Sequence, residues 1–325
     1  MKWVLTRLLA GVAAVAVLAV AASALLAHQY SGDPDASVGG TGADAAWVGS
    51  WEDTGALSAL LETGGIDTLY VRAGRIAQDG SVAPVEDTAS LLSWLEEHHP
   101  DVRALAWLRH TADGSSLVED RFGPEERAEL VPAAGELAGD GFDGVHLDVS
   151  PVTVNDPSYP TLVEEVREEL GEDPVLSVRA HHVELVPGGR VPSFVFGDGE
   201  KYWSKGYLDQ VTEPADDVVL PGVDAAMPTG SMYGGFMTRQ TTQALDALNR
   251  QEGITVRFGV PVHTSREWAP VHDNEDAETA LRAVRLGLGE VEPGADTTVG
   301  VALHVADEAD REDLDAYTSE WLGDG

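Results

Sequence analysis

Short aliphatic runs alternate with longer amphipathic stretches along most of the chain. The aliphatic runs are rich in Val, Leu and Ala, which is typical of parallel strands that are buried on both faces. Strands are therefore predicted over Ala45–Ser50, Ile66–Arg72, Arg103–Arg109, Gly144–Ser150, Val175–Ala180, Val218–Asp224, Thr255–Val262 and Thr298–Val305.

A helical stretch follows each predicted strand. Helices are expected over Gly55–Thr63, Thr88–His98, Pro124–Ala138, Tyr159–Leu170, Glu200–Val211, Met232–Arg250, Glu275–Leu288 and Arg311–Leu322. Eight strand–helix pairs without an obvious second domain predict an α/β fold, the closed (β/α)8 TIM barrel. An open doubly wound sheet is the alternative, but the first strand lacks the Gly-rich phosphate turn that would favour it.

The N-terminus has the pattern of a targeting segment. Lys2 and Arg7 precede an uncharged apolar run, Leu8–Ala27, whose 20 residues are just enough to span a bilayer. We expect residues 1–27 to be a signal peptide or a transmembrane anchor and residues 28–44 to be a flexible linker. The barrel, residues 45–325, is expected outside the cytoplasm, either secreted or anchored by its N-terminus.

The composition narrows the possible functions. The chain has 56 acidic and 20 basic residues, a net charge of −36 and no cysteine. Disulfides and thiolate metal sites are therefore excluded. An acidic surface repels nucleic acids and anionic membranes, so neither is an expected partner, and membrane contact is expected only through the N-terminal segment. We expect a monomer without cofactor.

Active sites of closed α/β barrels lie at the carboxyl ends of the strands. Aromatic, basic and carboxylate residues gather at those predicted ends, and aromatic faces with a few polar anchors suit sugar rings. Residues predicted to bind a substrate are Trp47, Trp51, Trp107, Arg179, His181, His263 and His304. No metal is expected, because the first strand lacks the His-x-His of barrel metallohydrolases.

The fourth predicted strand carries the most specific signal. Its alternation places His146, Asp148 and Ser150 on one face, which in a barrel points toward the mouth. A Ser–His–Asp triad within this face is excluded, because neighbours on one strand face stand too far apart to relay a proton. We predict that Asp148, Ser150 and Asp224 form the catalytic position of the barrel.

This strand resembles the motif Asp-Gly-x-Asp-x-Asp-x-Glu of glycoside hydrolase family 18. Asp143, Gly144 and Asp148 match the motif, His146 replaces the middle Asp, and Ser150 stands where the family carries its general acid. Later segments also resemble the family: Asp224 ends the sixth predicted strand, and the seventh and eighth end in His263 and His304.

The resemblance implies a substrate of N-acetylhexosamine type. In the family, the Glu at the position of Ser150 protonates the glycosidic oxygen, and the substrate's own acetamido group acts as the nucleophile. A Ser hydroxyl is too weak an acid for that step, and loss of a general acid lowers the rate by about 10²–10⁴.

Three functions remain open. The first is an extracytoplasmic barrel that binds a cell-envelope glycan or other polysaccharide with weak or no hydrolysis. The second is an active glycosidase with a relocated acid, for which Glu52, Glu184 and Glu267 are candidates. The third is a structural or interaction module of the envelope.

Two expectations concern the carboxylates. Asp143, at the start of its strand, is expected to bind backbone amides at the barrel's base. Asp148 and Asp224 are expected within one hydrogen bond or one water of each other, with Asp148 bonded to Ser150 or Arg179.

Overall fold

The computed structural model describes Arg7, Ala21, residues 23–34, Gly39 and residues 42–51, 54–85, 87–111, 122–186, 202–262, 274–304 and 311–323. Its strands are β1 (Asp44–Val48), β2 (Ile66–Ile76), β3 (Val82–Pro84), β4 (Arg103–Thr111), β5 (Gly144–Ser150), β6 (Val175–Arg179), β7 (His182–Val183), β8 (Tyr202–Trp203), β9 (Asp217–Leu220), β10 (Thr255–Pro261) and β11 (Thr298–His304). Its helices are α2 (Thr54–Leu61), α3 (Thr88–His98), α4 (Pro124–Gly139), α5 (Ser158–Leu170), α6 (Lys205–Thr212), α7 (Gly230–Leu248), α8 (Ala277–Glu290), α9 (Arg311–Ala316) and a terminal π-helix, Tyr317–Leu322.

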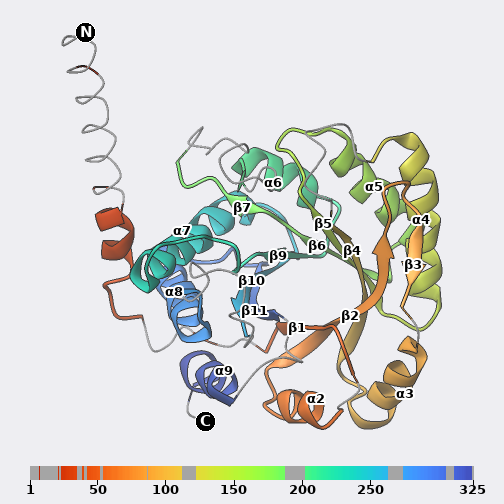
Figure 1. The fold of residues 1–325 in the computed structure, drawn as a ribbon, viewed down its shortest axis with the longest axis horizontal. Coiled ribbons are helices and arrows are strands. Elements are labelled where there is room, and N and C mark those ends of the chain that lie inside the picture. The colour runs from red at the N-terminus through yellow and green to blue at the C-terminus, as the bar shows by residue number, and fades with distance from the viewer. Residues whose placement is uncertain are drawn as a thin grey trace.

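The main sheet closes on itself (Figure 1). Its parallel strands follow the ring order β1, β2, β4, β5, β6, β9, β10 and β11, and β11 pairs again with β1. The short β3 adds to β2 in antiparallel fashion and extends that strand beyond the ring. The chain therefore folds as the predicted TIM barrel, because each strand is apolar enough to be covered on both faces.

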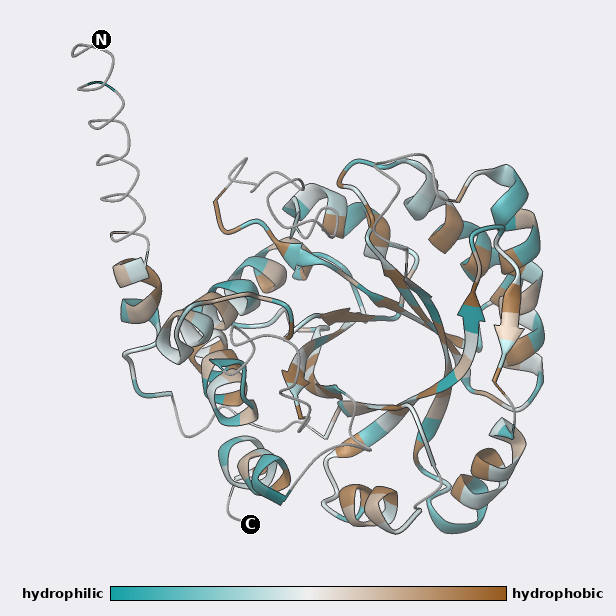
Figure 2. Ribbon diagram, in the orientation of Figure 1, coloured by the Kyte–Doolittle hydropathy of each residue, from teal (hydrophilic) through white to brown (hydrophobic). Residues whose placement is uncertain are grey.

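Two apolar layers hold the barrel. The larger lies between the strands and the helices, whose hydrophobic faces turn inward (Figure 2). A small second layer fills the inside of the ring and comprises Ala45, Trp47, Tyr70, Leu105, Trp107, Val219 and Ala302. The residues of this inner layer show which strand positions point toward the barrel axis. Residues two positions later on the same strands point into the mouth.

Asp44 ties the ends of the fold together. Its carboxylate accepts hydrogen bonds from the amide of Val301 on β11 (2.8 Å), the hydroxyl of Tyr317 (2.8 Å) and the indole of Trp321 (2.9 Å). Because Asp44 opens β1, one buried side chain fastens the first strand to the last strand and to the terminal helix. Burial raises the pKa of this carboxyl to about 6 despite those donors.

The end of the predicted signal or anchor segment and the start of the predicted linker both contact the barrel. Residues 23–29 are helical and lie beside α7 (Figure 1). A Cβ on Gly235 would come 1.8 Å from the carbonyl oxygen of Leu26, so the glycine permits this close approach. Arg282 of α8 lies 4.5 Å from the ring centroid of Tyr30 and donates to the carbonyl of Gly32. Composition alone did not predict the contacts of Tyr30 and Gly32, because the predicted linker, residues 28–44, consists mainly of small and polar residues.

Within the described residues, no helix has the length and apolar character needed to cross a bilayer. Most of the apolar run Leu8–Ala27 lies outside those residues, so a signal peptide or an anchor stays a prediction.

Asp44→Ala should destabilise the fold strongly. It leaves one amide, one hydroxyl and one indole N–H buried without an acceptor, at about 1–3 kcal/mol each when unrelieved by water. We expect the free energy of unfolding in urea to fall by at least about 3 kcal/mol. The exposed Asp101→Ala is the matched control, with an expected change within about 0.5 kcal/mol. Equal losses for the two variants would show that Asp44 does not fasten the barrel.

Candidate functional site at the barrel mouth

Asp148 forms the floor of the mouth. It lies on the inner face of β5 and is 4% exposed. Its Oδ2 accepts a hydrogen bond from the indole of Trp107 (3.0 Å), and its Oδ1 accepts one from Arg179 (3.0 Å). Arg109 stands 3.9 Å from Oδ2. The expected bond between Asp148 and Arg179 is therefore confirmed.

The charge of Asp148 is fixed by its neighbours. Burial alone would raise the pKa of the carboxyl, but Arg179, with help from Arg109 and hydrogen bonding, holds the pKa below its ordinary value. A carboxylate with a depressed pKa and both oxygens occupied cannot donate a proton. In its present contacts Asp148 orients and neutralises the surrounding cations.

His146 fills the inside of the barrel below Asp148 and is fully buried. The indole of Trp47 donates to its Nε2 (3.2 Å), and its Nδ1 lies 2.7 Å from the hydroxyl of Ser177. Nε2 is thus the acceptor, so Nδ1 carries the proton and the ring is neutral. Tyr70 stacks on the ring with centroids 4.0 Å apart. Burial lowers the pKa of His146 to about 4, which keeps it uncharged near neutral pH.

A buried ion pair lies at the inner layer's lower side. Arg257 contacts Asp217 at 2.7 Å and Asp67 at 3.0 Å, while Tyr70 donates to Asp217 at 2.6 Å. This network was not predicted from the sequence, because its members come from β2, β9 and β10. A cavity of about 260 Å³ beside Asp217 and Arg257 opens at this opposite end of the barrel, not at the mouth.

Asp143 has a structural place at the same lower end. Its Oδ2 accepts a hydrogen bond from the amide of Ala104 at 2.7 Å. It thereby joins the start of β5 to β4, as its position in the sequence led us to expect.

Several predicted binding residues occupy the interior rather than the surface of the mouth. Trp47 is 1% exposed and Trp107 is 4% exposed, and the indole N–H of each is engaged by the barrel's own side chains. This arrangement corrects the expectation that these two rings meet a sugar directly. They position His146 and Asp148 instead. Trp51 is only partly buried and packs against the outer apolar layer.

His181 also serves the protein's own loops. Its Nε2 accepts a hydrogen bond from the amide of Val152 (2.8 Å), and its ring stacks on Trp203 with centroids 4.8 Å apart. Burial lowers its pKa to about 3, so the ring is neutral. His181 therefore fastens the loop after β5 to β8, and a direct contact with substrate stays a prediction.

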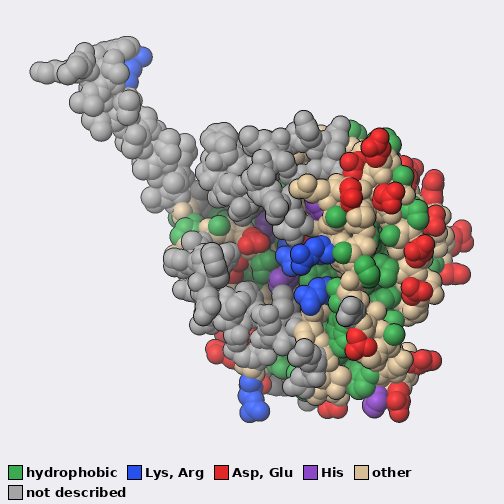
Figure 3. All heavy atoms as spheres, turned by 45° about the vertical axis from the view of Figure 1, so that its right-hand side comes forward, with side chains coloured by type: hydrophobic (Ala, Val, Ile, Leu, Met, Phe, Trp, Pro, Cys, Tyr) green, Lys and Arg blue, Asp and Glu red, His purple; other side chains and the backbone are tan. Residues whose placement is uncertain are grey.

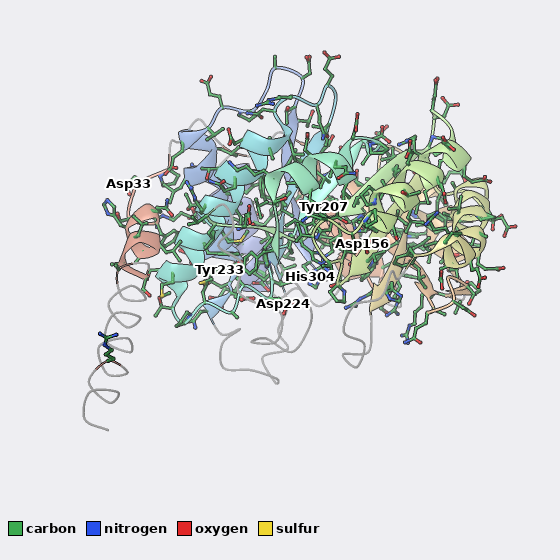
Figure 4. All side chains as sticks on the ribbon, turned by 90° about the horizontal axis from the view of Figure 1, so that it is seen from above. Asp33, Asp156, Tyr207, Asp224, Tyr233 and His304 are labelled. Atoms are coloured by element: carbon green, nitrogen blue, oxygen red, sulfur yellow. The ribbon has the colours of Figure 1, made fainter. Side chains whose placement is uncertain are left out.

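The remaining predicted residues lie at the rim or outside the described residues. β9 ends at Leu220, so Asp224 falls in the following loop rather than at the strand end; it is exposed and its φ is 63°. His304 ends β11, with its ring 5.3 Å from that of Trp47. Figure 4 shows Asp224 and His304 at the same edge of the barrel. The proximity of Asp148 and Asp224 stays a prediction, and His263 lies outside the described residues.

Sequence reasoning missed Glu275, a second carboxylate of this edge. Its two oxygens accept hydrogen bonds from the amides of Asp224 (2.9 Å) and Ala226 (3.0 Å), and both of those residues have positive φ. Glu275 thus holds the loop after β9 in a conformation that L-residues rarely adopt. Only its place just before α8 in the sequence could have indicated a role at the mouth.

The candidate proton donors differ in their placement. Ser150 lies at the end of β5 and is partly exposed, in the position where the family 18 motif carries Glu. Glu184 directly follows β7 and is 8% exposed, whereas Glu52 and Glu267 lie outside the described residues. Among the described residues, no group of three or more His, Asp or Glu could hold a metal ion.

Comparison with solved structures places this geometry in a known class of barrel. The chitinase of Chromobacterium violaceum matches with a TM-score of 0.59 and 14% identity over 87% of this chain and 99% of its own. The spore cortex-lytic enzyme of Bacillus megaterium matches with a TM-score of 0.61 and 12% identity over 86% and 73% of the two chains. A family 18 N-acetylglucosaminidase of Paenibacillus barengoltzii matches with a TM-score of 0.54 and 14% identity over 85% and 99%.

The chain therefore shares the barrel fold of these chitinase, cortex-lytic and family 18 N-acetylglucosaminidase structures, at low sequence identity. No family model matches it, and no curated protein matches it. At these identities the likeness establishes the fold alone.

Removing Arg179 should leave the charge of Asp148 poorly compensated. We expect Arg179→Met to lower the free energy of unfolding by about 3 kcal/mol, near the low end for a broken buried pair because Trp107 and Arg109 remain. Asp148→Asn should then recover part of that loss in the Arg179→Met background. The exposed pair Arg103–Asp67 supplies the control, since Arg103→Met should change stability by less than about 1 kcal/mol. If Asp148→Asn destabilises both backgrounds equally, the two residues are not coupled.

Stability should fall as the pH decreases from about 6.5 to about 4. His146 and His181 stay neutral in the folded chain but take up protons when unfolded, so acid favours unfolding by up to about 1.4 kcal/mol per pH unit for each. Asp44 acts in the opposite direction below pH 6, because its folded pKa is raised. Because two histidines oppose one carboxyl, the free energy of unfolding should fall overall as the pH decreases through this range.

Urea unfolding of His146→Gln across this range measures the effect. The variant should be less stable at pH 6.5 and should show a shallower dependence on pH than the unaltered chain. The exposed His98→Gln should keep the original slope. An unchanged slope in His146→Gln would mean that His146 is not buried in its neutral form.

Proposed function

We propose that this barrel binds a glycan, of N-acetylhexosamine type, in its mouth outside the cytoplasm, and that it does not cleave it by the family 18 route. The observation that supports this most directly is the engagement of Asp148 by Trp107 and Arg179, next to a Ser at the position of the general acid. With Ser at the position of the general acid, the mouth retains the means to hold a sugar but lacks the family 18 group that protonates the leaving group.

The second function of the family residue is also altered. In the resemblance, Asp148 matches the carboxylate that orients the substrate's acetamido group during nucleophilic attack. Here that carboxylate is held by a guanidinium on one oxygen and an indole N–H on the other, so turning toward a substrate would break a buried ion pair. The Ser at position 150 and the contacts of Asp148 thus argue separately against hydrolysis by the family 18 route.

The proposal places the protein among glycan-binding barrels at the cell envelope. Its structural neighbours include a chitinase and a spore cortex-lytic enzyme, which agrees with an exported protein that carries an N-terminal targeting pattern. A relocated acid at Glu184 is the alternative that keeps hydrolysis.

Incubation of the unaltered chain with N-acetylhexosamine oligosaccharides separates these functions. We expect saturable binding by calorimetry and no shortened products by mass spectrometry after a day. Products that disappear in Glu184→Gln but persist in the exposed control Glu97→Gln would establish the relocated acid instead. Absence of binding to every glycan would favour a structural or interaction module.

A further inference from the structure

Four arginines gather on one side of the mouth. Arg72 and Arg75 belong to β2, Arg109 to β4 and Arg179 to β6. In the register of the strands, Arg72 lies opposite Trp107, Arg75 opposite Arg109, and Arg109 opposite Asp148. Arg75 and Arg109 therefore stand at the level of Asp148, and Arg72 lies one step lower, at the level of Trp107.

The direction of these side chains follows from the inner layer. Tyr70 and Trp107 both belong to the apolar layer inside the ring. Arg72 and Arg109 come two positions later on the same strands, so they share that face and point into the mouth. Figure 3 shows basic side chains near the middle of this side of the molecule, next to histidine and hydrophobic groups, with acidic side chains toward its outer edge.

Among the described residues, the ion pairs on this side of the mouth involve more positive than negative groups. Asp148 contacts Arg179 and Arg109, at 3.0 and 3.9 Å, and is the one carboxylate that ion pairs of the described residues place against the four guanidinium groups. Arg72 and Arg75 are exposed, and no ion pair joins either to another residue of the described chain. Within the described part of the chain, the ion pairs on this side of the mouth thus set one carboxylate against four guanidinium groups.

This excess of basic groups is contrary to the rest of the chain. With a net charge of −36, a random rim would carry acids, and the solvation of an acidic protein gives no reason to place exposed arginines together. The other described acids of this edge, Asp224 and Glu275, belong to the loops after β9 and before α8, and β9 lies across the ring from β2. Packing does not require Arg72, Arg75 or Arg109, because all three are exposed.

We infer that the mouth selects an anionic glycan, whose carboxylate or sulfate groups are bound by Arg72, Arg75 and Arg109. This inference rests on the proposed function and specifies the chemical class of the ligand. Guanidinium groups bind carboxylate, sulfate and phosphate through paired hydrogen bonds, and the exposed side chains of Arg72, Arg75 and Arg109 can reach a ligand in the mouth. Arg109 is further oriented by its position 5.8 Å from the ring centroid of Trp107.

Three oligosaccharide hexamers test the inference by titration calorimetry with the full chain. Chitohexaose is neutral, a hyaluronan hexamer carries carboxylates, and a keratan sulfate hexamer carries sulfates without carboxylates. We expect at least one anionic hexamer to bind about tenfold more tightly than chitohexaose at 50 mM NaCl, with the preference shrinking at 500 mM NaCl. Which anionic hexamer binds more tightly identifies the group that the arginines recognise.

Single substitutions locate the binding groups. Arg72→Gln and Arg75→Gln should each weaken binding of the preferred anionic hexamer by about tenfold and leave chitohexaose binding within about twofold. Arg250→Gln is the matched control, since it removes the same charge from an exposed arginine that follows α7 at the opposite end of the barrel, and should change neither.

The possible failures are distinct. Equal affinity for the neutral and anionic hexamers, or equal weakening by Arg250→Gln, would overturn selection by the arginines while leaving glycan binding in place. No binding to any of the three hexamers would overturn both this inference and the proposed function.

Discussion

Asp148 carries a buried negative charge at the floor of the barrel mouth, and the arrangement of the surrounding side chains follows from the need to compensate that charge. A lone carboxylate in such a place would be several kcal/mol unfavourable. Arg179 supplies the opposite charge from β6, and Trp107 supplies a hydrogen bond from β4. Both oxygens of Asp148 are thereby engaged, so this carboxylate is not set to exchange a proton with a ligand.

Below that floor the barrel follows the same rule with different groups. Its interior is narrow, so each polar side chain there must find a partner inside the ring. His146 is neutral and bonded on both ring nitrogens, and Arg257 is paired with Asp217. Where the family motif carries an Asp, a neutral His bonded to Trp47 now fills the space. Relative to the family 18 motif, the chain thus differs both at Ser150 and at His146.

The fold could be read from the sequence because strands buried on both faces must be aliphatic. Thr88–His98 and Gly144–Ser150 have the predicted bounds, and the other barrel strands differ from prediction only at their ends. The short β3, β7 and β8 were not predicted, since two or three residues carry no periodicity. The last predicted helix is divided into α9 and a π-helix, and composition gave no signal for that change.

The site was less accessible to sequence reasoning. The partner of Asp148 was predicted because Arg179 ends a neighbouring strand, and Asp143 was placed by its position before β5. The exposure of the tryptophans was not predictable. Trp47 and Trp107 lie near the ends of their strands, as rim residues do, yet closure of the ring turns both side chains inward. Charge balance at the rim was equally hidden, because it depends on which strands become neighbours. Arg75 and Arg109 lie on different strands, far apart in the chain, but the pairing of β2 and β4 brings them to one level.

A crystal structure of the unaltered chain soaked with an anionic N-acetylhexosamine oligosaccharide tests the account most directly. The account predicts an unbroken oligosaccharide in the mouth above Asp148, with its anionic groups within hydrogen-bond distance of Arg72 or Arg75. A split oligosaccharide with a glutamate at the broken bond, or a glycan bound elsewhere with the mouth empty, would contradict it.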